Sequence, residues 1–188
     1  MQALLRLHNM VFDALDRAAG TWLLPLLARL TFAATLLVYY WNSASTKLGD
    51  GVLGLFRPSV GAYAQIFPQQ LEAAGYDASQ LSILHWLMVV AGTWAEFLLP
   101  ALIVLGLATR LAALGMIGFV TLQSLTDIYG HGQSDAATIG AWFDRFPDGV
   151  ILDQRLFWGF TLAYLVVRGA GAVSLDALLR QRAVPAMA

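Results

Sequence analysis

Three side chains of this sequence are candidates for moving protons or binding a metal. His131 lies between two glycines, which let the backbone bend tightly and present the imidazole, and Asp127 precedes it by one helical turn. His85 lies in a separate segment. Imidazole and carboxylate groups suit zinc, copper or iron, but these residues lack an HxxxH or similar spacing. We therefore predict no metal site and assign proton transfer to His131 and Asp127. The alternative is that His131 is a solvated loop side chain.

A second set of residues has the chemistry to bind an organic cofactor. Gln123 and Asp127 are spaced to share one face of a helix, and a polar stripe on a membrane helix normally faces the interior. Aromatic walls with a few polar groups suit a pocket of the size of a quinone head group. The residues that we predict to bind it are Trp41, Lys47, His85, Trp86 and Gln123. The alternative is an ordinary aromatic belt at the water interface.

Glu96 is the lone carboxylate of a long apolar run, where an acid is costly and needs a partner or a function. From the expected helix ends, Glu96 lies about 16 Å deep and Arg29 about 12 Å deep. We therefore predict a structural ion pair between Arg29 and Glu96, joined by Arg110 from the turn below. The functional alternative is proton delivery to a redox head group, or anchoring of that group.

Composition limits the class of protein. Hydrophobic residues make up 59% of the 188 residues and charged residues 12%, which is about half the charged share of an average soluble domain. This indicates a single membrane domain over residues 1–188. Cysteine is absent, which excludes disulfides, thiolate metal sites and iron–sulfur ligation. No basic patch with interleaved aromatic residues is present, so we predict no nucleic-acid partner.

Hydrophobic runs predict an all-α fold, in which four transmembrane helices form a bundle. The expected spans cover about residues 22–40, 83–107, 111–128 and 156–173. Residues 1–20 have an amphipathic helical pattern that is typical of an interfacial helix. The connections 42–82 and 129–154 are rich in glycine and polar residues, which predicts irregular loops on one side of the membrane.

The distribution of basic residues predicts the orientation. Residues 1–20, the 108–110 turn and the tail after Val167 are short and hold six arginines: Arg6, Arg17, Arg110, Arg168, Arg180 and Arg182. The opposite side, which consists of the two long loops and the span ends beside them, holds four basic residues and eight acidic ones. By the positive-inside rule, both termini are expected in the cytoplasm and the long loops on the periplasmic side.

Several short motifs carry a family resemblance. They are Arg29 in the first span, Ser45–Leu48, Ala95–Phe97, Gly106–Leu111, and the tail Gly169–Asp176. With these motifs the chain resembles the DoxX family of small four-helix bacterial membrane proteins. The resemblance implies a multi-pass protein of the bacterial inner membrane. The roles that it implies are a quinone-reducing subunit in thiosulfate oxidation, a member of a complex that handles oxidative or thiol stress, or an accessory protein in metal handling.

Taken together, the residues and the resemblance predict the membrane subunit of a small redox system. It would exchange electrons with quinone in its periplasmic half, and a protein partner would supply the electrons. The alternative is a non-catalytic scaffold in an oxidative-stress or metal-handling pathway. A transporter is a third class, but four helices without an evident repeat would have to oligomerise. The predicted partners are the lipid bilayer and either a protein partner or further copies of the chain.

Overall fold

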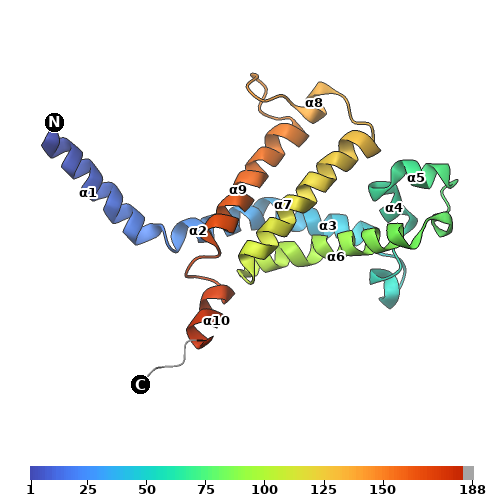
Figure 1. Ribbon diagram of the computed structural model, residues 1–188, viewed down its shortest axis with the longest axis horizontal. Coiled ribbons are helices and arrows are strands. Elements are labelled where there is room, and N and C mark those ends of the chain that lie inside the picture. The colour runs from blue at the N-terminus through green and yellow to red at the C-terminus, as the bar shows by residue number, and fades with distance from the viewer. Residues whose placement is uncertain (184–188) are drawn as a thin grey trace.

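Four helical segments long and apolar enough to cross a bilayer make up the body of the protein (Figure 1). The computed structural model describes residues 1–183, and all regular structure within them is helical. The spans are Leu23–Lys47, Ile83–Leu105, Thr109–Gly130 and Val150–Arg168. Only 22% to 28% of the most apolar stretch of each span is fully buried within the protein, so most of its residues lie at least partly on the surface, as lipid contact requires. The predicted all-α membrane fold is confirmed.

Each span is built from one to three helical pieces. The spans consist of α2 (Leu23–Phe32), a π-helical turn (Ala33–Leu37) and α3 (Val38–Lys47); α6 (Ile83–Leu105); α7 (Thr109–Leu125) and a π-helical turn (Thr126–Gly130); and a π-helical turn (Val150–Gln154) and α9 (Arg155–Arg168). The other elements are α1 (Gln2–Ala19), α4 (Val60–Ile66), α5 (Pro68–Ala73), α8 (Ala136–Ile139), α10 (Leu175–Ala183) and short 3-10 turns at Val52–Leu55 and Ala78–Gln80.

Three predicted span ends differ from the structure by about one and a half to two helical turns. The first span continues to Lys47, and its hydroxyl side chains are satisfied within the helix. Ser45 Oγ donates to the Trp41 carbonyl at 2.7 Å and Thr46 Oγ1 donates to the Ser43 carbonyl at 2.7 Å. The fourth span begins at Val150, earlier than predicted, and ends at Arg168 because Gly169 has a φ of +77°. The polar residues near these span ends are typical of loops, which explains the difference between prediction and structure.

The spans pack as two neighbouring antiparallel pairs. In Figure 1, α3 runs along α6 while α7 lies beside α9, and the short α6–α7 turn joins the two pairs. Phe32, Ile103, Met116 and Leu162 are fully buried where the four spans meet. The short helices α4 and α5 pack on the first half of α6, so they cap one end of the bundle. Helix α1 extends away from the bundle and buries no residue.

Arg29 fastens the inner end of the bundle, the end that holds the α6–α7 turn. Its Nε donates to the Ile103 carbonyl at 3.0 Å and its Nη2 donates to the Val104 carbonyl. Its Nη1 donates to the carbonyls of Val173 and, at 3.3 Å, Ala170. The last carbonyls of a helix have no partner within it, so a buried guanidinium fork satisfies them efficiently.

This arrangement makes the predicted Arg29–Glu96 ion pair wrong. Arg29 is level with the last turn of α6, about 10 Å along the helix from Glu96. Depth along separate helices does not reveal which backbone carbonyl groups a buried arginine can bind instead of a carboxylate. Arg110, the predicted third member, is exposed and forms no salt bridge within residues 1–183. Its guanidinium lies against Gly169 instead.

Asp176 provides a second tie at the same end. Its carboxylate accepts hydrogen bonds from the backbone N–H groups of Ala108 at 2.7 Å and Thr109 at 3.0 Å, so it caps the start of α7 from a distant part of the chain. Its own N–H donates to the Gly106 carbonyl at 2.8 Å. Partial burial opposes ionisation, but the hydrogen bonds from Thr109 and Ala108 outweigh it and hold the pKa of Asp176 below its usual range.

Replacing Arg29 should show how much this fastening stabilises the fold. An Arg29→Lys variant keeps the charge but cannot reach all four carbonyls, so we expect it to lose about 2 kcal/mol or more of stability. Thermal melting of the purified protein in detergent measures the loss. The exposed Arg17→Lys on α1 is the matched control and should melt like the parent. An Arg29→Lys variant as stable as the parent would contradict this role.

The Asp176 cap should make stability depend on pH. An Asp176→Asn variant should be less stable than the parent by about 1 kcal/mol at neutral pH. Because the folded-state pKa is lowered, the carboxylate stabilises the fold above its usual pKa of about 3.9, and this is lost as pH falls through the folded-state value. Melting curves should therefore converge below about pH 4. A difference that is equally large at low pH would refute the cap, and the exposed Asp13→Asn is the control.

Candidate functional site

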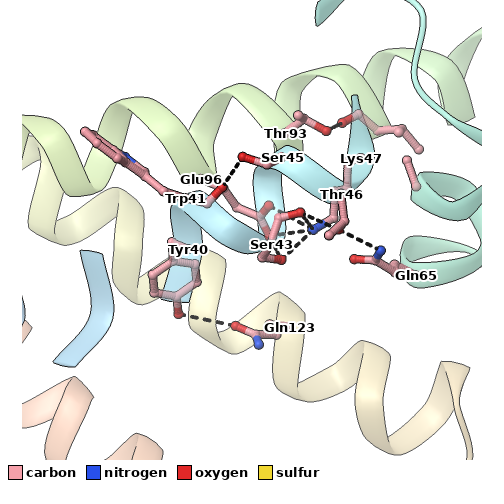
Figure 2. A network of polar contacts seen from close by, with 12 residues as sticks. Tyr40, Trp41, Ser43, Ser45, Thr46, Lys47, Gln65, Thr93, Glu96 and Gln123 are labelled. Atoms are coloured by element: carbon pink, nitrogen blue, oxygen red, sulfur yellow. Dashed lines mark hydrogen bonds and ion pairs between the residues drawn. The ribbon is translucent and has the colours of Figure 1, made fainter. Parts of the chain in front are cut away.

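A buried ion pair joins the first two spans. Lys47 Nζ lies 2.8 Å from Glu96 Oε2 and 3.0 Å from Glu96 Oε1, and each residue is only 4% exposed (Figure 2). Ser43, one turn before Lys47, accepts from Nζ at 2.7 Å and donates its own hydroxyl to Glu96 Oε1 at 3.2 Å. The ammonium and the carboxylate are thus paired with each other and also hydrogen-bonded to Ser43, as buried charges require.

The pair is held by elements from three parts of the chain. Glu96 lies near the middle of α6, whereas Lys47 ends α3. The segment leading into α4 covers that end, because the Ser59 N–H donates to the Lys47 carbonyl at 3.0 Å and Gln65 Nε2 donates to Thr46 Oγ1 at 3.2 Å. The structure therefore gives Glu96 a buried partner, as predicted, but that partner is the lysine expected to bind a head group.

A second polar cluster lies beside this pair, where α3, α7 and α9 meet. Tyr40 Oη donates to Gln123 Oε1 at 3.3 Å, and Gln123 Nε2 donates to Tyr39 Oη at 2.8 Å. The Tyr40–Gln123 contact is visible in Figure 2. The Tyr39 ring is 5.8 Å from the ring of Trp158, which contacts the Arg155 guanidinium at 5.9 Å. The chain of contacts thus continues from α3 to α9.

Arg155 connects the cluster to Asp127. It donates through Nη1 to Ser124 Oγ at 2.8 Å and through Nη2 to Asp127 Oδ2. Arg155 is 7% exposed, and its buried Nε has no hydrogen-bond partner within the described residues. We refer to Tyr39, Tyr40, Gln123, Ser124, Asp127, Arg155 and Trp158 together as the α3–α7–α9 cluster.

Two π-helical turns position the charged members of this cluster. Asp127 lies in the turn that extends α7, and Arg155 directly follows the turn that opens α9. A π-helical turn shifts the residues after it around the helix axis, and such turns are frequent at functional sites. Here they bring Arg155 and Asp127, on neighbouring antiparallel spans, into direct contact.

The remaining predicted site residues do not join the α3–α7–α9 cluster. Trp41 Nε1 donates to the Phe97 carbonyl at 3.1 Å, and Trp86 Nε1 donates to the Phe56 carbonyl at 3.0 Å. His85 contacts Ser82 Oγ at 2.8 Å and stacks edge-on against Phe67. The exposed His131 contacts the Gln65 carbonyl at 3.0 Å. The predicted convergence of all these groups is therefore wrong, because backbone carbonyls of the short helices and of α6 engage several of them. Within residues 1–183, no three His, Asp or Glu side chains gather as a metal site would require.

Sequence reasoning missed several members of these two sites. The sequence analysis puts Arg155 before the fourth span. Its position between Ile151–Leu152 and the apolar run that starts at Leu156 is nevertheless a signal for a charge within the membrane. Ser43 and Tyr39 carried no distinctive signal, because hydroxyl groups are common near span ends. Their roles depend on which helices pack together.

A double-mutant cycle tests the Lys47–Glu96 pair. Lys47→Met and Glu96→Leu should each cost about 3–5 kcal/mol, because each leaves an unpaired buried charge. The double variant should lose far less than the sum, since both charges are removed. Thermal melting in detergent measures each variant. The rival cycle of Arg29→Met with Glu96→Leu should be additive, and stronger coupling of Glu96 to Arg29 than to Lys47 would refute the assignment.

Comparison with known proteins identifies the family. The family model described as DoxX matches residues 24–126, more than half of the 188-residue chain. The matched region includes Arg29, Lys47 and Glu96, and the Arg29-binding tail follows it. No curated protein and no solved structure matches the chain. The chain therefore belongs to the DoxX family and is a multi-pass membrane protein.

Proposed function

We propose that this protein is the membrane subunit of a small redox system and binds a quinone head group at the α3–α7–α9 cluster. The observation that carries the proposal is the buried Arg155 Nε, which has no hydrogen-bond partner among the described residues and lies within a cluster of aromatic and amide groups. A buried donor without a partner is costly, and a quinone carbonyl is an acceptor that would satisfy it.

The chemistry of the cluster suits a quinone. A quinone ring is flat and apolar, with two carbonyl oxygens that accept hydrogen bonds. Tyr39 and Trp158 offer aromatic surface, while the Gln123 amide and the Arg155 guanidinium offer donors. Tyr39 is 44% exposed on the apolar flank of the bundle, so a lipid-soluble quinone could approach from the bilayer.

Reduction of a quinone to a quinol needs two electrons and two protons. In the proposed reaction a partner protein donates both electrons, and the protons reach the two quinone oxygens from water through Asp127. The Asp127 side chain is 30% exposed and bonded to Arg155, so it connects the solvent edge of the cluster with its interior. His131 remains a second candidate for proton transfer, although its contact is with Gln65 on the capping helix.

The proposal includes a location. In a bacterial inner membrane with both termini in the cytoplasm, the α3–α7–α9 cluster would lie in the periplasmic half of the bilayer. The basic residues near the α6–α7 turn and on α1 and α10 support this orientation.

Binding of a short-chain quinone tests the proposal. Decylubiquinone added to the purified protein should raise its melting temperature in a saturable way. A Gln123→Leu variant should bind decylubiquinone about tenfold more weakly, because leucine is similar in size to glutamine but cannot donate a hydrogen bond. Thr121→Val is the matched control, since Thr121 lies on the same helix, is exposed, and bonds only its own helix through the Ile117 carbonyl.

Two outcomes would overturn the proposal. The proposal is wrong if decylubiquinone changes neither the melting temperature nor the tryptophan fluorescence of the folded protein. Equal loss of binding in Gln123→Leu and Thr121→Val would place the quinone elsewhere. Failure to bind quinone together with recovery of a defined protein partner would favour the scaffold alternative.

A further inference from the structure

A cavity of about 580 Å³ lies at the inner end of the bundle, away from both polar sites described above. Three arginines from three different elements line it. Arg110 belongs to the first turn of α7, Arg168 is the last residue of α9, and Arg180 lies on α10. Its size falls within the range of ligand sites, which is about 300–1,000 Å³.

The charge of this cavity is unbalanced. Asp176 is the one acidic residue among its lining residues, and the backbone N–H groups of Ala108 and Thr109 already occupy its carboxylate. Arg168 donates to the Gly20 carbonyl at 3.4 Å and Arg180 to the Asp176 carbonyl at 3.5 Å, both long contacts to neutral groups. None of the three guanidinium groups forms a salt bridge within residues 1–183. The cavity therefore has the potential to bind an anion.

Apolar side chains border the same cavity. Leu111 is 73% exposed and Leu179 is 52% exposed, and both are lining residues. Leu111 starts the apolar part of the third span, so the cavity lies at the level where a bilayer changes from hydrocarbon to head groups. A free phosphate ion would leave these leucines and most of the volume without contacts.

We infer that this cavity binds the phosphate head group of an anionic phospholipid, with Arg110, Arg168 and Arg180 around the phosphate and the acyl chains along Leu111. Guanidinium groups bind phosphate through paired, charge-assisted hydrogen bonds. Basic pockets beside transmembrane helices on the cytoplasmic face are suited to lipids of this class. The site is independent of the proposed quinone site, because it lies at the opposite end of the bundle.

Lipid titration of the purified protein tests this inference. Short-chain phosphatidylglycerol should raise the melting temperature in a saturable way, whereas phosphatidylcholine at the same concentration should raise it less. The Arg110→Gln/Arg180→Gln variant should bind phosphatidylglycerol at least about tenfold more weakly, because it loses two charged donors. Native mass spectrometry counts the lipids that remain bound to each variant.

Arg182 supplies a matched control. It is exposed on α10 at the same membrane face but does not line the cavity, so Arg182→Gln should retain the affinity of the parent within about twofold. Equal weakening by Arg182→Gln and by the double variant would overturn the inference in favour of diffuse attraction. Equal stabilisation by phosphatidylcholine would overturn it as well. Equal stabilisation by inorganic phosphate would identify a free anion, not a lipid, as the ligand.

Discussion

The buried pair between Lys47 and Glu96 fixes how the first two spans meet. A lone carboxylate halfway along an apolar helix is tolerated only with a partner, and Lys47 supplies one from the last turn of α3. This requirement sets the length of the first span, since α3 must continue far enough for the ammonium to reach Glu96. It also determines where the Ser59 segment can close over the bundle, because Ser59 bonds the Lys47 carbonyl.

At the opposite end of the bundle, charged side chains bind backbone groups and do not form an ion pair with each other. Arg29 binds four backbone carbonyl groups there, two in the last turn of α6 and two in the segment that follows α9. Asp176 does the same for the first N–H groups of α7. Several motifs that resemble the family, Arg29, Gly106 and the Gly169–Asp176 tail, thus meet at one structural fastening. Their presence explains the fold more directly than it explains an activity.

The α3–α7–α9 cluster differs from the two fastenings, which are the Lys47–Glu96 pair and the Arg29–Asp176 end, because not all of its buried polar groups have partners. The fastenings satisfy their charged groups with protein partners, whereas Arg155 keeps one buried donor without a partner among the described residues and Tyr39 faces outward. Two π-helical turns adjoin it, and no such turn is needed merely to cross a bilayer. For these reasons we place the proposed function at this cluster and assign stability to the other two sites.

The sequence by itself determined the membrane class, the number of spans and the family, because long apolar runs and short motifs are local signals. It also showed that Glu96 needs a buried partner and that Gln123 and Asp127 share a polar helix face. Only the tertiary structure decided that the partner is Lys47 and that Arg155 meets Asp127. Which side chains pair across two helices depends on the register of the helices and on π-helical turns. The hydrophobic pattern of the sequence predicts neither.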